Sequence, residues 1–261
     1  MNLLDEILAS KRASLGDRKA KVTFAELRSR IADQDGTRGF LTALRSAQTP
    51  VALIAEVKPG SPSRGVIREG LRPDEMARTF EAAGAHCLSV LTDVAYFHAD
   101  PENLALARNA VSLPCLRKDF VVDEYDVWEA RAMGADAVLH IVNGLTDVQL
   151  RDYREIARGL GMDALVEVHS ESEAERAVSS GATLIGVNNR DLESFETSVS
   201  VGERLLPTLV GKGLTLVSES ALTNQADVER VTAAGAHAVL IGTAFCEAAD
   251  PEAKVREVMG W

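Results

Sequence analysis

The chain has 261 residues, of which 46% are hydrophobic, and a formal net charge of −11. It can bury a large core, has no apolar run long enough to cross a bilayer, and is too acidic to expect nucleic acid as a partner. A few local cations and backbone amides would still suffice to bind one small anion. The three cysteines lie far apart in apolar surroundings, and the N-terminus lacks the uninterrupted apolar segment of a signal peptide. We therefore expect a reduced, cytoplasmic protein that contacts no membrane.

The first strand-like pattern begins only after residue 48. The preceding residues, 1–48, contain two helix-like stretches, the first of which is the amphipathic MNLLDEILASKRASLG. We interpret 1–48 as an N-terminal helical extension packed on the rest, and 1–261 as a single domain, because nothing in the chain resembles a flexible linker.

From residue 51 onward, apolar runs alternate with helical patterns. Four helical stretches end in Gly-Ala and pass directly into an apolar run, as in EAAGAHCLSVLTD, RAMGADAVLHIV, SSGATLIGVNN and AAGAHAVLIGTA. A glycine in the left-handed conformation ends such a helix, and an apolar run without alternation is typical of a strand buried on both faces. Further strand-like runs occupy 51–58, 113–119, 163–169 and 214–220, and helical patterns occupy 73–83, 101–110, 123–133, 146–159, 171–180, 224–234 and 250–259.

About eight strands alternating with helices favour one architecture. An open doubly wound sheet would more often carry a glycine-rich dinucleotide loop after its first strand, and no GxGxxG is present. The pattern therefore predicts an α/β protein, a (β/α)8 TIM barrel with an N-terminal helical extension.

Polar residues gather where the candidate strands end, which is where TIM barrels carry their active sites. One charged residue at a strand end is usually a solvated loop residue, but polar groups at five strand ends weaken that explanation. The residues concerned are Glu56, Lys58, Lys118, Glu167, Asn188, Arg190, Glu219 and Ser220.

The stretch LRKDF at 116–120 places three charges at the end of one apolar strand. Side chains alternate between the two faces of a strand, so Lys118 is predicted to point into the barrel mouth. Arg117 and Asp119 would then face the helix layer and form a structural ion pair.

The histidines are interpreted as structural. We expect His140 and His169 to lie on the strand face opposite to the neighbouring catalytic candidates, and no two histidines have the spacing of metal ligands. No metal site is predicted.

Several segments together closely resemble the indole-3-glycerol phosphate synthase family, the (β/α)8 enzymes of tryptophan biosynthesis. They are IAEVKPGSPSRG, LSVLTDVAYF, LRKDFVVDEYDVWEARAMGADAVL, ALVEVH, IGVNNRDLESFE and LVSES, and the resemblance, which includes the N-terminal LDEILASKR, covers nearly the whole chain. It implies a carboxy-lyase that closes the ring of 1-(2-carboxyphenylamino)-1-deoxyribulose 5-phosphate, with loss of carbon dioxide and water, to give indole-3-glycerol phosphate. No cofactor is implied. We expect a monomer whose partner is this phosphorylated small molecule, with no fused isomerase domain because the chain stops at Trp261, just after its last helix.

The resemblance also implies catalytic roles. Lys118 would protonate the substrate ketone, since a lysine in a partly desolvated pocket is a suitable acid near neutral pH. Glu167 matches the base of the dehydration step, Lys58 its partner acid, and Glu56 the residue that keeps a lysine charged and placed. Asn188 and Glu219 complete the catalytic set.

Substrate contacts follow from the same resemblance. Arg190 and Ser220 would orient the substrate, apolar walls would hold the aromatic ring, and a phosphate site would form after strands one, seven and eight. The implied walls are Phe97, Phe120, Leu139 and Leu192, and the implied phosphate-binding residues are Ser61, Ala221, Gly242 and Thr243. Ala221 stands where the family pattern SESG has glycine, and Ala99 stands where the family often has glycine.

Two alternatives remain open at this point. One is a paralogue that acts on a ring-substituted anthranilate intermediate of a secondary pathway. The other is a non-enzymatic phosphate-binding barrel, or another phosphate-site barrel such as the phosphoribosylanthranilate isomerase type. The combination of Lys118, Glu167 and Glu56 argues against this second alternative.

Overall fold

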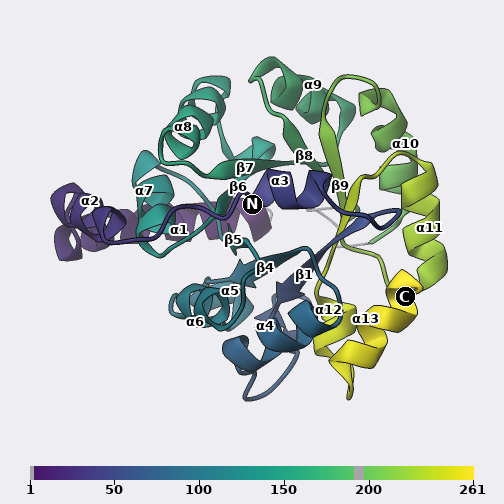
Figure 1. The fold of residues 1–261 in the computed structure, drawn as a ribbon. Coiled ribbons are helices and arrows are strands. Elements are labelled where there is room, and N and C mark those ends of the chain that lie inside the picture. Colours follow the sequence, from purple (N-terminus) through teal and green to yellow (C-terminus); the bar gives the residue numbers. More distant parts are fainter. Residues whose placement is uncertain (1–2, 191–196) are drawn as a thin grey trace.

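The computed structural model, which describes residues 3–190 and 197–261, contains a closed barrel of parallel strands (Figure 1). Strands consecutive around the barrel are consecutive in the chain, and the last pairs with the first, with Ala238 opposite Ala52. The predicted TIM barrel is thereby confirmed. Its strands are β1 (Ala52–Val57), β4 (Cys87–Leu91), β5 (Cys115–Lys118), β6 (Ala137–Ile141), β7 (Asp163–Val168), β8 (Leu184–Asn188), β9 (Thr215–Glu219) and β10 (Ala238–Ile241).

Helices surround the barrel, and those predicted from the sequence are present to within about two residues at each end (Figure 1). The four Gly-Ala junctions behave as expected, because Gly84, Gly134, Gly181 and Gly235 all have φ between 83° and 110°. The outer helices are α4 (Pro73–Ala82), α6 (Asn103–Ala110), α7 (Glu124–Ala132), α8 (Asp147–Gly159), α9 (Glu171–Ser179), α10 (Ser200–Leu209), α11 (Gln225–Ala233) and α13 (Pro251–Met259).

The elements that the sequence patterns did not predict are mostly short. They are the hairpin strands β2 (Gly60–Ser61) and β3 (Gly65–Val66), the helices α5 (Val94–Phe97) and α12 (Thr243–Cys246), and the 3₁₀ turn η1 (Val142–Gly144). The longer α10 contains Gly202 and Pro207, both weak helix formers, so its helical pattern is faint. No helix in residues 3–190 or 197–261 is both long and apolar enough to cross a membrane.

The N-terminal segment forms three helices, not two: α1 (Leu3–Lys21), α2 (Phe24–Ala32) and α3 (Phe40–Arg45). The six-residue α3 lies at the end of the barrel where the strands begin, near the centre of the ring in Figure 1. There the Leu41 amide donates to Asp163, the first residue of β7, at 2.8 Å, and Arg45 Nε donates to Thr215, the first residue of β9, at 2.9 Å. The start of α1 lies at the opposite end, so the segment contacts both ends of the barrel.

The barrel interior is built from alternate residues of each strand. In β1, β5, β7 and β9 the last apolar residue of this inner core is followed, two positions later, by a charged residue on the same face. Because of this two-residue period, each of these four strands ends in a charged side chain that points inward, and the four side chains form a ring at the carboxyl end of the barrel. The pairs are Ile54 and Glu56, Leu116 and Lys118, Leu165 and Glu167, and Val217 and Glu219.

Candidate active site

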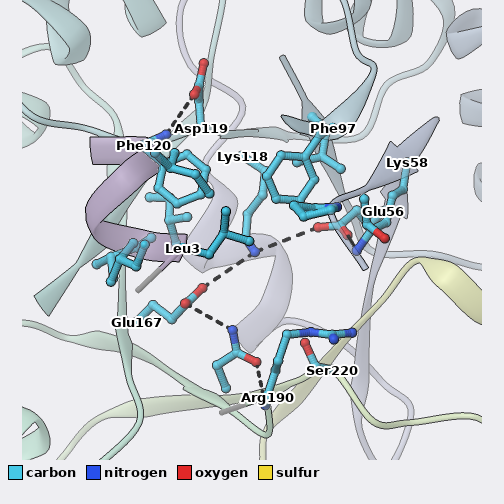
Figure 2. Close-up of a pocket in the computed structure, with 18 of the residues that line it drawn as sticks. Leu3, Glu56, Lys58, Phe97, Lys118, Asp119, Phe120, Glu167, Arg190 and Ser220 are labelled. Carbon is cyan, nitrogen blue, oxygen red and sulfur yellow. Dashed lines mark hydrogen bonds and ion pairs between the residues drawn. The ribbon is translucent and has the colours of Figure 1, made fainter. Parts of the chain in front are cut away.

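The ammonium group of Lys118 lies among three buried carboxylates at the mouth of the barrel, and Figure 2 shows it with two of them, Glu56 and Glu167. Lys118 Nζ is 3.3 Å from Glu219 Oε2, 3.5 Å from Glu167 Oε2 and 3.9 Å from Glu56 Oε2. The four side chains come from β5, β9, β7 and β1, and each carboxylate is at most 4% exposed. The prediction that Lys118 points into the mouth is confirmed. We call these four residues the inner cluster.

The charge state of Lys118 differs from the sequence-based expectation. Burial alone would lower the pKa of Lys118, but Glu219, Glu167 and Glu56 outweigh it and raise that pKa. The expectation of an ammonium acidified by desolvation was therefore wrong, because the closed barrel brings three carboxylates around it. Any acid chemistry of Lys118 must come from its position against the substrate.

Glu219 has the opposite environment. Burial, together with the nearby charges of Glu167 and Glu56, raises the pKa of Glu219 to about 8, even though Lys118 acts against this shift. Neither carboxylate oxygen of Glu219 has a hydrogen bond to the described residues. Gly186 on β8 makes room for the group, because a Cβ atom there would lie 2.0 Å from Glu219 Oε1. Glu219 thus holds a proton near neutral pH.

Glu56 links the two lysines of the site. Its Oε1 lies 3.4 Å from Lys58 Nζ, and its Oε2 accepts a hydrogen bond of 3.0 Å from Ser89 Oγ. Burial alone would raise the pKa of Glu56, but Lys58 and Lys118 outweigh burial and lower that pKa, so the group stays ionised. Ser89 was not predicted, although its even spacing from Cys87 on β4 places it on the inner face. Gly242 packs against Glu56, and a Cβ atom there would lie 2.8 Å from Glu56 Oε1.

Glu167 is held from its far side. Asn188 Nδ2 donates to Glu167 Oε1 at 3.1 Å, and His169 Nε2 lies 3.3 Å from the same oxygen. Burial favours the protonated form of Glu167, but Lys118, His169 and Asn188 outweigh it and lower its pKa. The prediction that His169 lies on the opposite face was wrong, because positions 167 and 169 differ by two and share a face. His140 does face away, and it is buried.

One half of the site is mainly apolar. Phe97 of α5, Phe120 and Leu139 line it as predicted, and the two phenyl rings lie 6.0 Å apart between centroids at an angle of 38°. Leu3 and Ile7 of α1 line the same hollow, a contact that an amphipathic helix pattern does not specify. The fourth predicted wall residue, Leu192, lies outside the described residues.

The other half is polar and is lined by the loops after β9 and β10. Ala221, Gly242 and Thr243 line it as predicted, together with Arg64 and Lys254. Ser61, which was also predicted to bind phosphate, does not line this polar half; it lines the apolar half. The two halves share Glu56, Lys58, Lys118, Arg190 and Ser220, so the charged groups lie between them.

The backbone after β9 is left-handed at Ala221, where the family pattern has glycine. Ser220 and Ala221 have φ values of 65° and 62°, in the left-handed region that glycine adopts most readily. Alanine at 221 thus keeps the geometry of a glycine-type loop at the cost of about 1 kcal/mol of backbone strain.

The charged side chains on either side of Lys118 pair with each other and not with the inner cluster, although Asp119 also lines the apolar half. Arg117 Nη2 lies 3.1 Å from Asp119 Oδ2 and 2.8 Å from Glu129 Oε2, and Lys11 Nζ lies 2.6 Å from Asp119 Oδ1. Figure 2 shows Asp119 turned away from Lys118. The predicted structural ion pair is confirmed. We call Lys11, Arg117, Asp119 and Glu129 the outer cluster.

The arrangement supports acid-base chemistry on a molecule with an aromatic end and an anionic end. It places one buried ammonium within 4 Å of three carboxylates, of which Glu167 has a lowered pKa and Glu219 a raised one. Among residues 3–190 and 197–261, no group of histidine, cysteine and carboxylate side chains is arranged to hold a metal ion.

Comparisons with known proteins point in the same direction. The sequence profile of the family described as indole-3-glycerol phosphate synthase matches residues 4–258. A protein of that name from Neisseria meningitidis serogroup B is 47% identical over 256 residues, covering 97% of this chain and 98% of its own. Another, from Carboxydothermus hydrogenoformans, is 43% identical over 262 residues, covering 98% of both chains.

Solved structures with little sequence similarity share the fold. An N-acetylmannosamine-6-phosphate 2-epimerase from Clostridium perfringens, 14% identical, covers 74% of this chain and 86% of its own with a TM-score of 0.59. A 3-hexulose-6-phosphate synthase, 16% identical, covers 80% and 99% with the same TM-score. These two likenesses concern the barrel alone.

Proposed function

The chain belongs to the indole-3-glycerol phosphate synthase family, and on that premise we propose how its barrel mouth makes indole-3-glycerol phosphate. The substrate is 1-(2-carboxyphenylamino)-1-deoxyribulose 5-phosphate. The observation that carries the proposal is the position of Lys118, which lies among three buried carboxylates between an apolar and a polar half-site.

The two halves suit the two ends of this substrate. The carboxyphenyl ring fits the apolar half, against Phe97, Phe120 and Leu139. The family resemblance adds Leu192 to the residues proposed to contact this ring. The phosphate fits the polar half, where Ala221, Gly242 and Thr243 meet Arg190 and Ser220, with Ser61 contributing from the adjacent hollow. The ketone then lies between them, beside Lys118.

Ring closure needs a proton at the ketone oxygen. As the carboxylate-bearing ring carbon attacks the ketone carbon, Lys118 donates its proton to that oxygen, which becomes a hydroxyl group. Glu219 contributes by holding a proton, because a neutral Glu219 removes one anion from beside the ammonium and so eases its deprotonation. Carbon dioxide then leaves from the same ring carbon, and its bonding electrons remain with the ring system.

Dehydration completes the indole. Glu167, held ionised by Lys118 and Asn188, accepts a proton from the nitrogen side. Lys58 donates a proton to the hydroxyl group, which leaves as water. Glu56 contacts both lysines and keeps them in place, and its charge helps to raise the pKa of Lys118.

The test is to mix the purified chain with the carboxyphenylamino substrate and follow indole fluorescence, with ring-substituted analogues in parallel. Efficient conversion of the unsubstituted substrate is expected, and preference for an analogue would favour the secondary-metabolism paralogue. Failure with every substrate would contradict the proposal and favour a phosphate-binding barrel.

Rapid-quench analysis of Glu167→Gln and Glu56→Gln then tests which carboxylate acts in ring closure and which in dehydration. A cyclised intermediate should accumulate in the first and unreacted substrate in the second, and stalling of both at unreacted substrate would contradict these roles.

Two further features complete the proposal. Residues 1–48 form one domain with the barrel, which the contacts of α1 with the mouth and of α3 with the opposite end support. The enzyme acts as a monomer in the cytoplasm.

A further inference from the structure

His169 lies directly behind the proposed base. It follows β7 by one residue, and its side chain is 13% exposed. The ring touches a carboxylate at each nitrogen, with Nε2 3.3 Å from Glu167 Oε1 and Nδ1 3.3 Å from Glu173 Oε2. An imidazole between two carboxylates joins the active site to the first turn of α9.

Two carboxylates require two donors. A neutral imidazole carries one N–H group, which can serve only one of its neighbours, whereas the imidazolium carries an N–H at each nitrogen. His169 Nδ1 forms a hydrogen bond with Glu173, and Nε2 faces Glu167 as an ion pair without a hydrogen bond. Burial alone would lower the pKa of His169, but Glu167 and Glu173 outweigh it and raise that pKa to about 10. His169 therefore stays positively charged at neutral pH.

The far end of this contact is anchored by the backbone. Glu173 Oε2 accepts a hydrogen bond from the His169 amide at 2.9 Å, and the Glu173 amide donates to Ser170 Oγ at 3.3 Å. The ring is thus fixed against the start of α9, an element that belongs to the scaffold. His140, on neighbouring β6, lacks such support, because among the described residues its ring has neither a hydrogen bond nor a carboxylate within ion-pair distance.

We propose that His169 is a positioning residue, which together with Asn188 holds Glu167 Oε1 so that Glu167 Oε2 stays ionised and turned toward the reacting atoms. This inference rests on the proposed role of Glu167 as the base. Without it, Asn188 alone would hold Oε1, and the carboxylate could rotate away from Lys118.

His169 also affects which carboxylate of the inner cluster binds a proton more readily. Glu167 pairs with Lys118 on one side and with His169 on the other, whereas Glu219 pairs with Lys118 alone among the described residues. The extra cation favours ionised Glu167 and protonated Glu219. Removal of His169 should therefore raise the pKa of Glu167 and let the two carboxylates compete for the proton.

The main test compares His169→Gln with Glu173→Gln. His169→Gln keeps one N–H donor and loses the charge. We expect kcat to fall by about 10- to 100-fold with little change in KM, and the acid limb of the kcat profile to move up by about one pH unit. Glu173→Gln leaves the ring in place and should give a smaller change of the same sign. Glu175→Gln, an exposed acid on the same helix, is the matched control and should match the wild type.

A second measurement does not depend on turnover. The His169 ring resonance, assigned by its loss in His169→Gln, should not titrate below pH 8 in the wild-type protein and should titrate at lower pH in Glu173→Gln. Titration of His169 near its ordinary pKa of about 6.5 would overturn the proposal even if the wild type makes product. So would an equal loss of kcat at every pH in His169→Gln, which is the signature of a purely structural role. An inactive wild type would instead contradict the proposed function, and the resonance would still decide whether His169 holds Glu167.

Discussion

The inner and outer clusters lie on opposite faces of β5, one residue apart, and they manage buried charge differently. In the outer cluster every oxygen of Asp119 has partners: Lys11 and the Phe120 amide for one, Arg117 and Thr92 for the other. Burial raises the pKa of Asp119, but Arg117 and Lys11 outweigh it and lower that pKa. In the inner cluster Glu219 has Lys118 at 3.3 Å from Oε2, but neither of its oxygens has a hydrogen bond to the described residues, and its pKa is raised.

The difference separates charge that stabilises the fold from charge that does chemistry. A fully partnered buried cluster holds its groups in one protonation state and joins α1 to the barrel. A cluster with more carboxylates than lysines keeps a proton that can move when substrate arrives. Four experiments test this contrast.

The largest effect is expected from removing the central cation of the inner cluster. Lys118→Ala should lower turnover by about two to four orders of magnitude while leaving the fold and substrate binding largely intact, because a positioned acid is lost. Lys118→Arg is the companion variant. It keeps a cation but should fail similarly, since guanidinium does not release its proton readily. Steady-state kinetics decide the matter, and near wild-type turnover in either variant would refute the assignment of Lys118 as the acid.

The matching change in the outer cluster should affect stability more than chemistry. Asp119→Ala leaves Arg117 and Lys11 without their shared carboxylate, so the free energy of unfolding should fall by about 3–5 kcal/mol. Denaturant titration measures this change. Asp152→Ala, in an exposed pair with Arg151, is the control and should cost less than about 1 kcal/mol. Equal losses in the two variants would mean that the outer cluster does not stabilise the fold.

His140 sharpens the contrast, because it is a buried ionisable group with no counter-ion in the part of the chain that the structure describes. Burial lowers the pKa of His140 to about 3, well below its unfolded value of about 6.5. The fold thus favours neutral His140: its stability is complete above pH 6.5 and declines as the pH falls from 6.5 toward 3. His140→Leu should remove this dependence.

Between pH 6.5 and 5, unfolding free energy should then fall by about 2 kcal/mol less in His140→Leu than in the wild type. Chemical denaturation at the two pH values gives the comparison. Parallel pH dependence of the two proteins would show that His140 does not contribute.

The smallest expected effect concerns the backbone. The helix ends of the outer layer use glycine for positive φ, whereas the mouth uses Ala221 at 62°. Ala221→Gly should tighten binding of inorganic phosphate or product by a few-fold, with little change in turnover at saturation, because about 1 kcal/mol of strain is relieved away from the reacting carbons. Isothermal titration measures it. Ala99→Gly, the other departure from the family pattern, is the control, since Ala99 lacks a positive φ. Unchanged or weaker binding in Ala221→Gly would mean that the loop has already adapted to alanine.

Much of the fold could be predicted because it is encoded locally. The Gly84, Gly134, Gly181 and Gly235 junctions mark where helices end, and unbroken apolar runs mark parallel strands. The helices α3 and α10 were not predicted, because the six residues of α3 and the internal proline of α10 leave little hydrophobic periodicity. The same alternation that defines a strand also directed Lys118 inward and Arg117 outward.

What the sequence determined was therefore which residues share a face; what only the tertiary structure decided was which faces meet. Ser89 contacts Glu56, and α1 contacts the apolar half-site, although these segments are far apart in the chain. The charge state of Lys118 depends on Glu56, Glu167 and Glu219, which arrive from three other strands. Side-chain direction follows from the two-residue period of a strand, but a pKa follows from distances between charges, and those distances exist only once the barrel has closed.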